Sequence, residues 1–336
     1  TVVNGGNVTT AGDQTYNGQL LISGSTTLAA ANITTNDDVL GAANGVGNLT
    51  LTTAGTAQLN GRLGFDPTPM TFQRLASLTI NGGGVTNFNN AGGGNANPTV
   101  ATTGLQQYDN NSVFQANTVF VTSGGNIVFN GNIDGPREGI VSPGSSGSAT
   151  FNGTIGAATP LFALQVENAA LITFNTTTVT TTLQQLYSSN SPVEVNPAGT
   201  GTITFTSNTS SVSFDNTLRG VNDGEDNVVI SANTTATFGG AVGDNNQRLN
   251  NLDATANANI SLANNITTLA SVTLTTGGYI VSGVATDDIT TATLTLLAAG
   301  DIGAAGNALQ IADVTNLTFT VGGSVFIDLT LELTAG

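Results

Sequence analysis

The chain has 336 residues, of which 21 are acidic and five basic, giving a formal net charge of −16, and it contains no Cys, His or Trp. It therefore lacks the imidazole bases, thiolate nucleophiles, disulfides and usual zinc, haem or iron–sulfur ligands on which much enzyme chemistry depends. Because nucleic acids and anionic membranes bind clustered basic residues, neither is an expected partner. The basic residues are all Arg and lie far apart, at Arg62, Arg74, Arg137, Arg219 and Arg248.

Gly, Asn and Thr dominate the composition, and Gly alone occurs 43 times. Such a chain could be disordered, but only 8% of its residues are charged, Pro is rare and the apolar residues are regularly placed, so a folded chain is expected. The longest apolar stretches, 20–22 and 293–299, fall far short of the roughly 20 residues that cross a bilayer, so no membrane insertion is expected. The first residue is Thr1 rather than Met, which suggests a processed chain or a piece of a longer one.

A period of two in short runs is the main local pattern. Apolar residues alternate with residues that are usually Thr or Ser, which is typical of short strands with one buried face. No stretch keeps a helical period of 3.6 residues. The runs include 49–51, 127–129, 172–174, 203–205, 212–214, 260–262, 272–274, 294–296 and 317–319.

Many of these runs are followed by Asn, Asp or Gly. These residues tolerate left-handed backbone conformations, so each strand is expected to end at a tight corner. Hairpins with Asn-Gly turns give the same local signal, and the connectivity must come from longer spacings. The clearest cases are 88–90, 129–131, 151–153, 174–175, 214–216 and 238–240.

Three sequence blocks recur in one order along the chain. They are Ala-x-apolar followed by Asn-Gly or Gly-Gly, then Leu-x-x-Leu-x-apolar, and Gln-x-Tyr or a close variant. The copies lie at 57–61, 149–153 and 236–240; at 75–80, 161–166, 249–254 and 314–319; and at 14–16, 106–108 and 184–187. The steps between matching positions of successive copies are unequal, and the last step of the second block is the shortest. The chain is therefore interpreted as degenerate repeats of about 90 residues.

The unequal steps favour a solenoid over tandem immunoglobulin-like sandwiches. A sandwich shortened by about a quarter would lose strands and its core, whereas a solenoid can lose one turn. At roughly 20 residues per turn, the sequence predicts an all-β parallel β-solenoid of about 16 rungs, on the order of 75 Å long, with no significant helix. It would form one continuous domain, 1–336, of four repeats: roughly 1–92, 93–180, 181–265 and 266–336.

Three stretches combine these strand and corner patterns: 12–18 followed by 26–28, 151–156 followed by 159–161, and 299–303 running to 322–325. Their pattern resembles the β-strand-repeat passengers of large bacterial surface proteins, the filamentous-haemagglutinin-like adhesins and autotransporter-type passengers. The resemblance covers nearly all of the chain. It implies a right-handed parallel β-helix, export to the bacterial cell surface and an adhesive or architectural role. It supplies no catalytic residues.

Adjacent carboxylates are the candidates for catalysis, at Asp37–Asp38, Glu225–Asp226 and Asp287–Asp288. Sugar-cleaving enzymes hold two carboxylates about 5–9 Å apart. Neighbours in a strand point to opposite faces, and neighbours at a corner splay into solvent, so solvated loops are the preferred interpretation. We assign no catalytic, cofactor-binding or metal-binding residue and expect no enzyme. A polysaccharide-binding or polysaccharide-cleaving β-helix is the remote alternative.

Two further motifs have more than one interpretation. The stretch 222–227 is rich in oxygen ligands and could hold Ca²⁺, but it matches neither an EF-hand loop nor the Gly-Gly-x-Gly-x-Asp repeat, so an acidic loop is preferred. The Thr-rich run 176–182 could present hydroxyl ranks, as in ice-binding solenoids. That interpretation needs Thr-x-Thr on one face of every rung, and strand propensity explains the Thr more simply.

The expected function is that of a secreted, non-enzymatic rod at a bacterial cell surface, acting as an adhesin stalk or a structural fibre segment. The alternative is a self-assembling extracellular filament or surface-layer subunit. The expected partners are other copies or flanking repeats of the same chain stacked end to end, and a glycan or protein on a host or neighbouring cell. No cofactor is expected, with Ca²⁺ the one ion considered.

Overall fold

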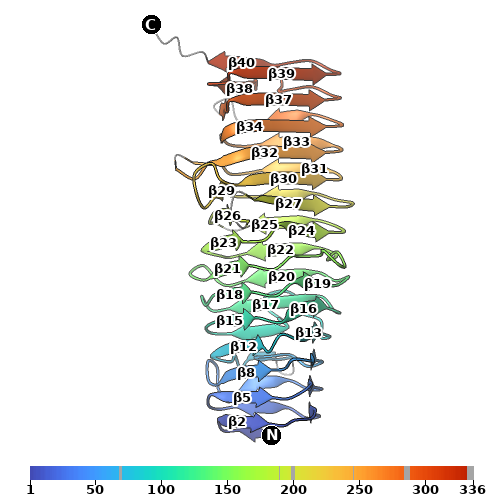
Figure 1. Cartoon of the computed structure of the whole chain (residues 1–336), viewed down its shortest axis with the longest axis vertical. Helices are drawn as coiled ribbons and strands as arrows, with labels where there is room; N and C mark the ends of the chain where they lie inside the picture. Colours follow the sequence, from blue (N-terminus) through green and yellow to red (C-terminus); the bar gives the residue numbers. More distant parts are fainter. Residues whose placement is uncertain (68–69, 189, 198–200, 245, 284–287, 331–336) are drawn as a thin grey trace. The chain divides into compact units, whose positions relative to one another are not determined.

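The computed structural model describes residues 1–67, 70–188, 190–197, 201–244, 246–283 and 288–330. In this part of the chain all regular structure is β-strand, and no helix is present that could cross a membrane. Apart from one short hairpin, the named strands pair in parallel and stack as a β-solenoid of about 13 turns (Figure 1). The predicted fold class is confirmed.

The solenoid has fewer turns than the 16 predicted because many turns are longer than the assumed length of roughly 20 residues. The turn that leads from Gly6 to its ladder partner Thr26 is a short one, and the turn from Leu49 to its partner Leu78 is considerably longer. The additional residues lie between the strands, where turns can lengthen without disturbing the ladder.

The chain divides into two compact units, Thr1–Ile172 and Thr173–Gly336. The boundary falls inside strand β23 (Leu171–Phe174), close to residue 180, where the second predicted repeat ends. The structure does not test the predicted boundaries of the four repeats.

In unit 1 the chain visits three parallel sheets in turn, so that each solenoid turn adds one strand to each sheet (Figure 1, dark blue to green). The first sheet contains β1 (Val2–Val3), β4 (Leu20–Ile22), β7 (Val39–Gly41), β14 (Val100–Thr102), β17 (Thr118–Thr122), β20 (Gly139–Ser142) and β22 (Leu164–Glu167). The second contains β2 (Gly6–Thr9), β5 (Thr26–Ala29), β8 (Asn48–Thr52), β12 (Ser77–Asn81), β15 (Gln106–Tyr108), β18 (Ile127–Phe129) and β21 (Ser148–Phe151). The third contains β3 (Gln14–Tyr16), β6 (Ile33–Thr35), β9 (Thr56–Leu59), β13 (Val85–Phe88), β16 (Asn111–Phe114) and β19 (Ile133–Asp134).

The first sheet of unit 1 is interrupted between β7 and β14 by an antiparallel hairpin, β10 (Phe65–Asp66) and β11 (Thr71–Phe72). The bridge residues Leu63 and Leu75 flank the hairpin and pair with the two ends of β14. Together they occupy the place of one strand in the sheet.

Unit 2 also has three parallel sheets (Figure 1, yellow to red). The first contains β25 (Gln185–Ser188), β28 (Val212–Phe214), β31 (Thr235–Phe238), β33 (Asn259–Leu262) and β35 (Ile280–Ser282). The second contains β26 (Val193–Val195), β29 (Leu218–Gly220), β36 (Asp288–Thr290), β38 (Leu309–Ala312) and β40 (Ile327–Thr330). The third contains β24 (Thr178–Thr181), β27 (Thr202–Ser207), β30 (Asn227–Ala232), β32 (Leu249–Ala256), β34 (Ile266–Thr276), β37 (Thr293–Ala298) and β39 (Asn316–Val321). The long strand β34 bends across two sheets, pairing with both β36 and β37.

The predicted alternation of apolar and polar residues places the apolar set inside each unit. In β12, for example, Leu78 and Ile80 are fully buried and Thr79 faces outward. Because successive strands lie in register, large side chains stack along the interior. Tyr108 and Phe129 are nearly parallel with ring centroids 4.7 Å apart, and Phe129 and Phe151 follow at 5.6 Å. Buried rings of this size supply much of the hydrophobic stabilisation of each turn.

The recurrent Gln-x-Tyr block forms one polar unit in all three copies, buried in the second and third and half-buried at Tyr16 in the first. The two side chains point to the same side of the strand, and the Tyr hydroxyl donates to the Gln Oε1 atom at 2.9–3.0 Å. The Gln Nε2 atom then donates to a main-chain carbonyl of another strand or loop, which fastens the interior of the solenoid. The pairs are Gln14–Tyr16, Gln106–Tyr108 and Gln185–Tyr187.

Corners follow the strands as predicted, but Asn occurs at them for a different reason than the one predicted. Among the described residues, positive φ values in residues other than Gly occur only at Met70, Asn168 and Asp313. Asn168 and Asp313 directly follow strands, but Asn89, Asn130 and Asn152 at the predicted corners do not adopt left-handed backbone. Asn residues at the corners form ladders instead, in which each side-chain amide donates to the Asn one turn earlier at 2.7–2.8 Å. One ladder follows four successive strands of the third sheet of unit 1, through Asn17, Asn36, Asn60 and Asn89.

The Gly residues at these corners are required by close stacking. A Cβ atom on Gly131 would lie 2.4 Å from the carbonyl oxygen of Asn110, and one on Gly153 would lie 2.3 Å from the carbonyl oxygen of Gly131. Neither residue has a positive φ. The turns are therefore packed backbone against backbone at these corners, where a side chain has no room.

In the first three copies of each block, the degenerate repeat has a constant number of strands although its length in residues varies. In this count each single bridge residue is a strand and the hairpin is omitted. Two bridge residues that flank one loop, Leu63 with Leu75 and Ile155 with Leu161, together make one strand. The step from β15 to β25 is then ten strands plus one for Ile155 and Leu161, which makes 11. The step from β3 to β15 is twelve strands, less two for the hairpin, plus one for Leu63 and Leu75, again 11.

Four further steps also contain 11 strands each: β9 to β21, β21 to β31, β12 to β22 and β22 to β32. These six steps thus share one structural period of 11 strands. The last and shortest step, from β32 to β39, contains only seven named strands and the bridge residue Ile302, so it does not keep this period.

Candidate functional site

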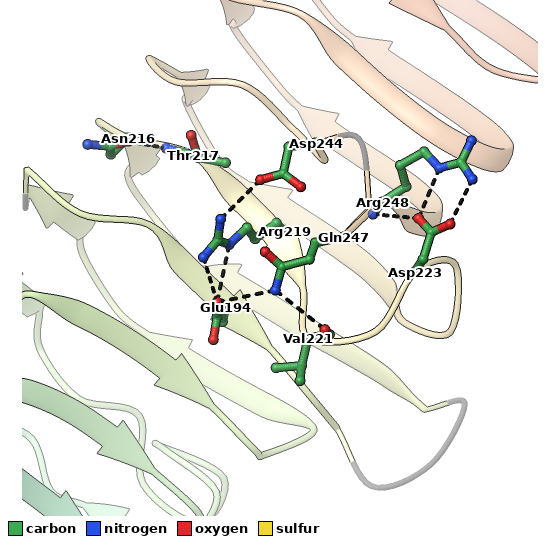
Figure 2. Close-up of polar contacts among 9 residues, drawn as sticks. All are labelled: Glu194, Asn216, Thr217, Arg219, Val221, Asp223, Asp244, Gln247 and Arg248. Atoms are coloured by element: carbon green, nitrogen blue, oxygen red, sulfur yellow. Dashed lines mark hydrogen bonds and ion pairs between the residues drawn. The ribbon is translucent and has the colours of Figure 1, made fainter.

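Both Arg residues of unit 2 pair with acidic side chains at two loops that leave the solenoid (Figure 2). Arg219 lies on β29 directly opposite Glu194 on the neighbouring strand β26. Its guanidinium contacts Glu194 Oε1 at 2.8 Å and Asp244 Oδ2 at 3.0 Å. The Gln247 side chain approaches Glu194 Oε1 and the carbonyl oxygen of Val221, at 3.4 Å from each. This network ties the loop that holds Asp244 and Gln247 to the sheet.

A second ion pair joins Arg248 to Asp223. The Arg248 side chain donates from Nε to Oδ1 at 2.9 Å and from a terminal nitrogen to Oδ2 at 2.7 Å, and its main-chain N–H donates to Oδ1 at 3.0 Å. These hydrogen bonds lower the pKa of Asp223 to about 2 and raise that of Arg248. The pair fastens the loop 220–226 to the segment that leads into β32 (Figure 2).

The same pair of loops occurs in unit 1, a correspondence that the sequence reasoning missed. The main-chain N–H of Gly41 donates to the Gln73 carbonyl, and that of Gly45 donates to the Arg74 carbonyl. In unit 2 the N–H groups of Gly220 and Gly224 donate in the same way to the Gln247 and Arg248 carbonyls. The detectable signal is Gln-Arg-Leu-x-x-Leu at 73–78 and 247–252, together with Gly-x-x-Asn/Asp-Gly at 41–45 and 220–224. Asn44 stands where unit 2 has Asp223, so the ion pair belongs to unit 2 alone.

The oxygen-rich stretch 222–227 does not converge on a cation site. Asp223 is bound to Arg248, and Glu225 accepts a hydrogen bond from the Asn222 side chain at 3.0 Å. Asn227 belongs to β30 and accepts from the amides of Asn250 and Asn251. In the described part of the chain, no three His, Cys, Asp or Glu side chains are grouped so that they could hold a metal ion.

Asp226 differs from the other acids of this stretch. Its side chain is buried, with 1% of the residue exposed, and neither carboxylate oxygen has a hydrogen-bond donor. Burial raises its pKa to about 6, and the charge of Glu225 adds to this rise, while the nearby main-chain N–H of Val221 partly opposes it. Glu225 and Asp226 therefore have separate environments and do not form a paired catalytic site.

The other two carboxylate pairs are structural or fall partly outside the described residues. Asp38 accepts the main-chain N–H of Arg62 at 2.8 Å and so braces a corner one turn away. Its burial raises its pKa, with Asp37 adding to the rise. Asp287 lies outside the described residues, and the Asp288 main-chain N–H donates to the Asn265 side chain.

The Arg residues of unit 1 also hold loops. Arg62 is buried beneath residues 91–98, where its guanidinium donates to the side chain and carbonyl of Asn97 and to the carbonyl of Ala91. The guanidinium of Arg74 lies 3.7 Å from the ring centre of Phe72 in the hairpin. Desolvation lowers the pKa of both Arg residues. The Arg62 and Arg74 side chains thus stabilise the loops that they contact.

The third sheet of unit 2 presents columns of hydroxyl groups on its outer surface. In β24, Thr178 and Thr180 face outward, whereas Val179 and Thr181 are buried, which is ordinary strand alternation. One outward column runs through Thr178, Thr204, Val229, Asp253, Thr273 and Thr295, and the next through Thr180, Thr206, Ser231, Thr255, Thr275 and Leu297. Both columns are broken by residues without a hydroxyl. The unbroken Thr-x-Thr array that ice recognition would need is therefore not formed here.

A shallow hollow of about 160 Å³ lies beside the second of these columns. Hydroxyl and amide side chains line most of it, and the Asn257 amide donates to Asn233 at 2.9 Å along its rim. The lining residues used below are Thr206, Ser231, Thr255, Asn208, Asn233 and Asn257. Such a surface can exchange hydrogen bonds with a neutral polar ligand.

Comparisons of this chain with protein-family models, with curated proteins and with solved structures find no match. Inference about function therefore rests on the chain's own geometry. That geometry consists of solenoid turns with filled interiors, loops fastened by Arg residues, one buried carboxyl group without a donor and a hydroxyl-rich outer surface on unit 2.

Proposed function

We propose that this chain is a secreted, non-enzymatic segment of a bacterial cell-surface protein, serving as an adhesin stalk or a structural fibre segment. The observation that carries the proposal is the way in which each turn is bonded to the next. Parallel ladders, stacked aromatic rings and Asn side-chain ladders all join successive turns. Separating two turns requires breaking these contacts together, which suits a segment that bears mechanical load.

The location can be tested in the cells that make the protein. A tagged chain should be cut by protease added outside intact cells, while a cytoplasmic marker protein remains whole. Protection of the tagged chain until the cells are lysed would contradict the proposed location.

Self-assembly is the second candidate, supported by exposed apolar residues on the outermost described turns. Val2 and Val8 are 63% and 39% exposed in β1 and β2, and Phe319 and Leu329 are 47% and 52% exposed in β39 and β40. Strand edges with exposed apolar residues can pair with further strands. Other copies of the chain, or flanking repeats, would cover them.

Electron microscopy of the purified chain over a range of concentrations distinguishes the two candidates. Ordered fibres with one axial repeat per chain would favour the filament. Single particles at all concentrations would favour a stalk segment.

Glycan binding is a third candidate, favoured by the hydroxyl-lined hollow on unit 2. Co-sedimentation with insoluble neutral polysaccharides tests it. The variant that combines Thr206→Val, Ser231→Ala and Thr255→Val should lose binding, whereas Thr150→Val, an outward Thr of β21 in unit 1, should retain it. Cleavage is tested by incubating the chain with acidic and neutral polysaccharides. A sugar-cleaving role would require activity that disappears on substitution of Glu225 or Asp226.

A further inference from the structure

A loop of unit 1, residues 91–98, lies against the outer face of the first sheet. The main-chain N–H of Gly92 donates to the carbonyl of Asn117, just before β17, at 2.8 Å. Further along the loop, the side-chain amide of Asn95 donates to Glu167, which is partly exposed in β22. The loop is therefore fastened to the solenoid at two points and forms a wall above the sheet.

Two hollows of about 250 Å³ each lie beside this loop, and together they are called the unit 1 groove. Asn117 lines both of them. The first extends from Asn117 to Gly94 of the loop and to Glu138, and the second extends to Ala91 of the loop and to Arg137. Each hollow is smaller than the roughly 300–1,000 Å³ of pockets that enclose a drug-sized ligand, so each suits a single small unit of a longer ligand.

The groove contains one cationic and one anionic side chain, and neither is paired within the described part of the chain. Arg137 is exposed, and its guanidinium makes one hydrogen bond, from Nε to the Gln115 carbonyl at 3.3 Å. Among the described residues, no acceptor contacts its terminal nitrogens and no donor contacts the Glu138 carboxylate. The Asn117 side chain accepts the main-chain N–H of Glu138 through Oδ1, which leaves its Nδ2 group as a donor. The groove thus offers donors and an acceptor to a ligand.

An exposed aromatic residue stands next to the groove. Phe162 follows Arg137 one turn further along, and its main-chain N–H donates to the Arg137 carbonyl at 3.1 Å. Phe162 is 47% exposed, whereas the Phe residues of nearby strands, such as Phe129 and Phe151, are buried. An exposed ring beside polar groups offers an apolar surface on which the C–H groups of a sugar can pack.

These groups match a sugar that carries a carboxylate. Arg binds a carboxylate through two parallel N–H···O bonds, Asn donates from its amide, and a Glu carboxylate accepts from hydroxyl groups. An extended peptide fits less well, because β17 and β20 beside the loop are each paired on both sides and leave no strand edge to extend. The net charge of −16 repels a densely charged polyanion, so carboxylates separated by neutral units are the better match.

We propose that the unit 1 groove binds a glycan in which carboxylate-bearing sugars alternate with neutral ones. The Arg137 guanidinium binds the carboxylate, Glu138 and Asn117 bind hydroxyl groups of the neighbouring sugar, and the Phe162 ring packs against a sugar face. The site is distinct from the hydroxyl-lined hollow of unit 2, whose lining contains no charged side chain, and does not depend on glycan binding there.

Titration of the intact chain with a hyaluronan hexasaccharide, in which glucuronate alternates with a neutral sugar, tests the groove. The NMR signals of the Arg137 Nε–H group and of the Gly94 and Asn117 amides should shift, and calorimetry gives the affinity. Arg137→Gln should weaken binding by about ten-fold or more. Reduction of the probe's carboxylates to alcohols should weaken binding to the unaltered chain by the same factor. It should cause no further loss in Arg137→Gln, because both changes remove one contact.

Thr150→Glu is the charge-matched control, because it lowers the net charge by one unit, as Arg137→Gln does, at an outward position on another sheet of unit 1. It should bind the probe like the unaltered chain. Arg137→Gln should unfold at the temperature of the unaltered chain, because Arg137 is exposed and makes one long hydrogen bond.

Equal affinities of the unaltered chain for the acidic and the reduced probe would overturn the proposal. So would a loss of binding in Thr150→Glu as large as that in Arg137→Gln, or the absence of shifts in the three NMR signals at millimolar probe. Tighter binding of an acidic peptide than of the hexasaccharide would overturn the assignment to glycans.

Discussion

Polar groups inside the solenoid are stabilising only while each of them is paired. The buried Tyr108 hydroxyl donates to Gln106 Oε1 at 2.9 Å, and Gln106 Nε2 donates to the carbonyl of Val121 at 2.8 Å. The Gln106 and Tyr108 side chains thus satisfy their hydrogen-bonding groups inside the solenoid. At the residue scale, the function of these groups is to fix the position of one strand against others.

Removing the Tyr108 hydroxyl should be costly although the ring is kept. In Tyr108→Phe, Gln106 Oε1 stays buried without a donor, and the free energy of unfolding should fall by about 1–3 kcal/mol. Urea denaturation followed by circular dichroism measures the change. Tyr279→Phe is the control, because Tyr279 is 48% exposed and should tolerate the change. Equal effects in the two variants would contradict the proposed role of the pair.

Asp223 and Asp226 should give opposite pH dependences of stability. The pKa of Asp223 is lowered to about 2, so its contribution is present above about pH 4 and is lost as the pH falls toward 2. The pKa of Asp226 is raised to about 6, so its contribution is full below about pH 4 and is lost as the pH rises through 6.

The urea concentration at the midpoint of unfolding, measured from pH 2 to 8, distinguishes the contributions of Asp223 and Asp226 to stability. Asp223→Asn should remove the loss of stability on the acid side, by no more than about 1 kcal/mol because the ion pair is partly exposed. Asp226→Asn should remove the decline between pH 4 and 6. A pH profile unaltered by both substitutions would show that neither group controls stability.

At the element scale, single Gly residues decide where loops can leave the solenoid. Gly64 and Gly243 each follow a bridge residue at corresponding points of the two units and have φ values of 78° and 73°. A Cβ atom on Gly64 would lie 1.9 Å from the carbonyl oxygen of Ala101. Both the left-handed backbone and the lack of space exclude a side chain there.

Gly64→Ala should therefore destabilise unit 1 by about 2–4 kcal/mol, since strain from the positive φ adds to displacement of the Ala101 carbonyl. Gly12→Ala is the matched control, because Gly12 has no positive φ and no atom near its Cβ position. Thermal unfolding of the two variants measures the difference. A Gly64→Ala variant as stable as Gly12→Ala would show that this corner is not tightly packed.

Short-range patterns in the sequence were enough to predict the strands and the fold class. Alternating runs such as 127–129 and 212–214 became strands, since a period of two places one side of each in the interior. Corners with Asn were predicted from its tolerance of left-handed backbone. In the structure the Asn side chain instead hydrogen-bonds to a residue on the preceding turn, as Asn36 does to Asn17. The burial of Asp226 next to an exposed Glu225 could not be predicted, because it depends on contacts that form only on folding.

At the scale of the whole chain, the first three copies of each block are related by strand count rather than by length. Six steps between corresponding blocks each contain 11 strands, although the steps differ in their length along the sequence. Within unit 1 the copies β3 and β15 therefore fall on different sheets. Because 11 is not a multiple of three, successive copies separated by 11 strands begin on different sheets.

The proposed load-bearing function follows from bonds between successive turns, and pulling on the single chain tests it most directly. With the two termini attached to a force probe, turns such as those from Gly6 to Thr26 and from Leu49 to Leu78 should be released one at a time or in small groups. Each released turn should add about 70–100 Å of contour length. Resolved steps of this size under sustained force would support a structural segment. Smooth extension at low force, without resolved steps, would contradict it.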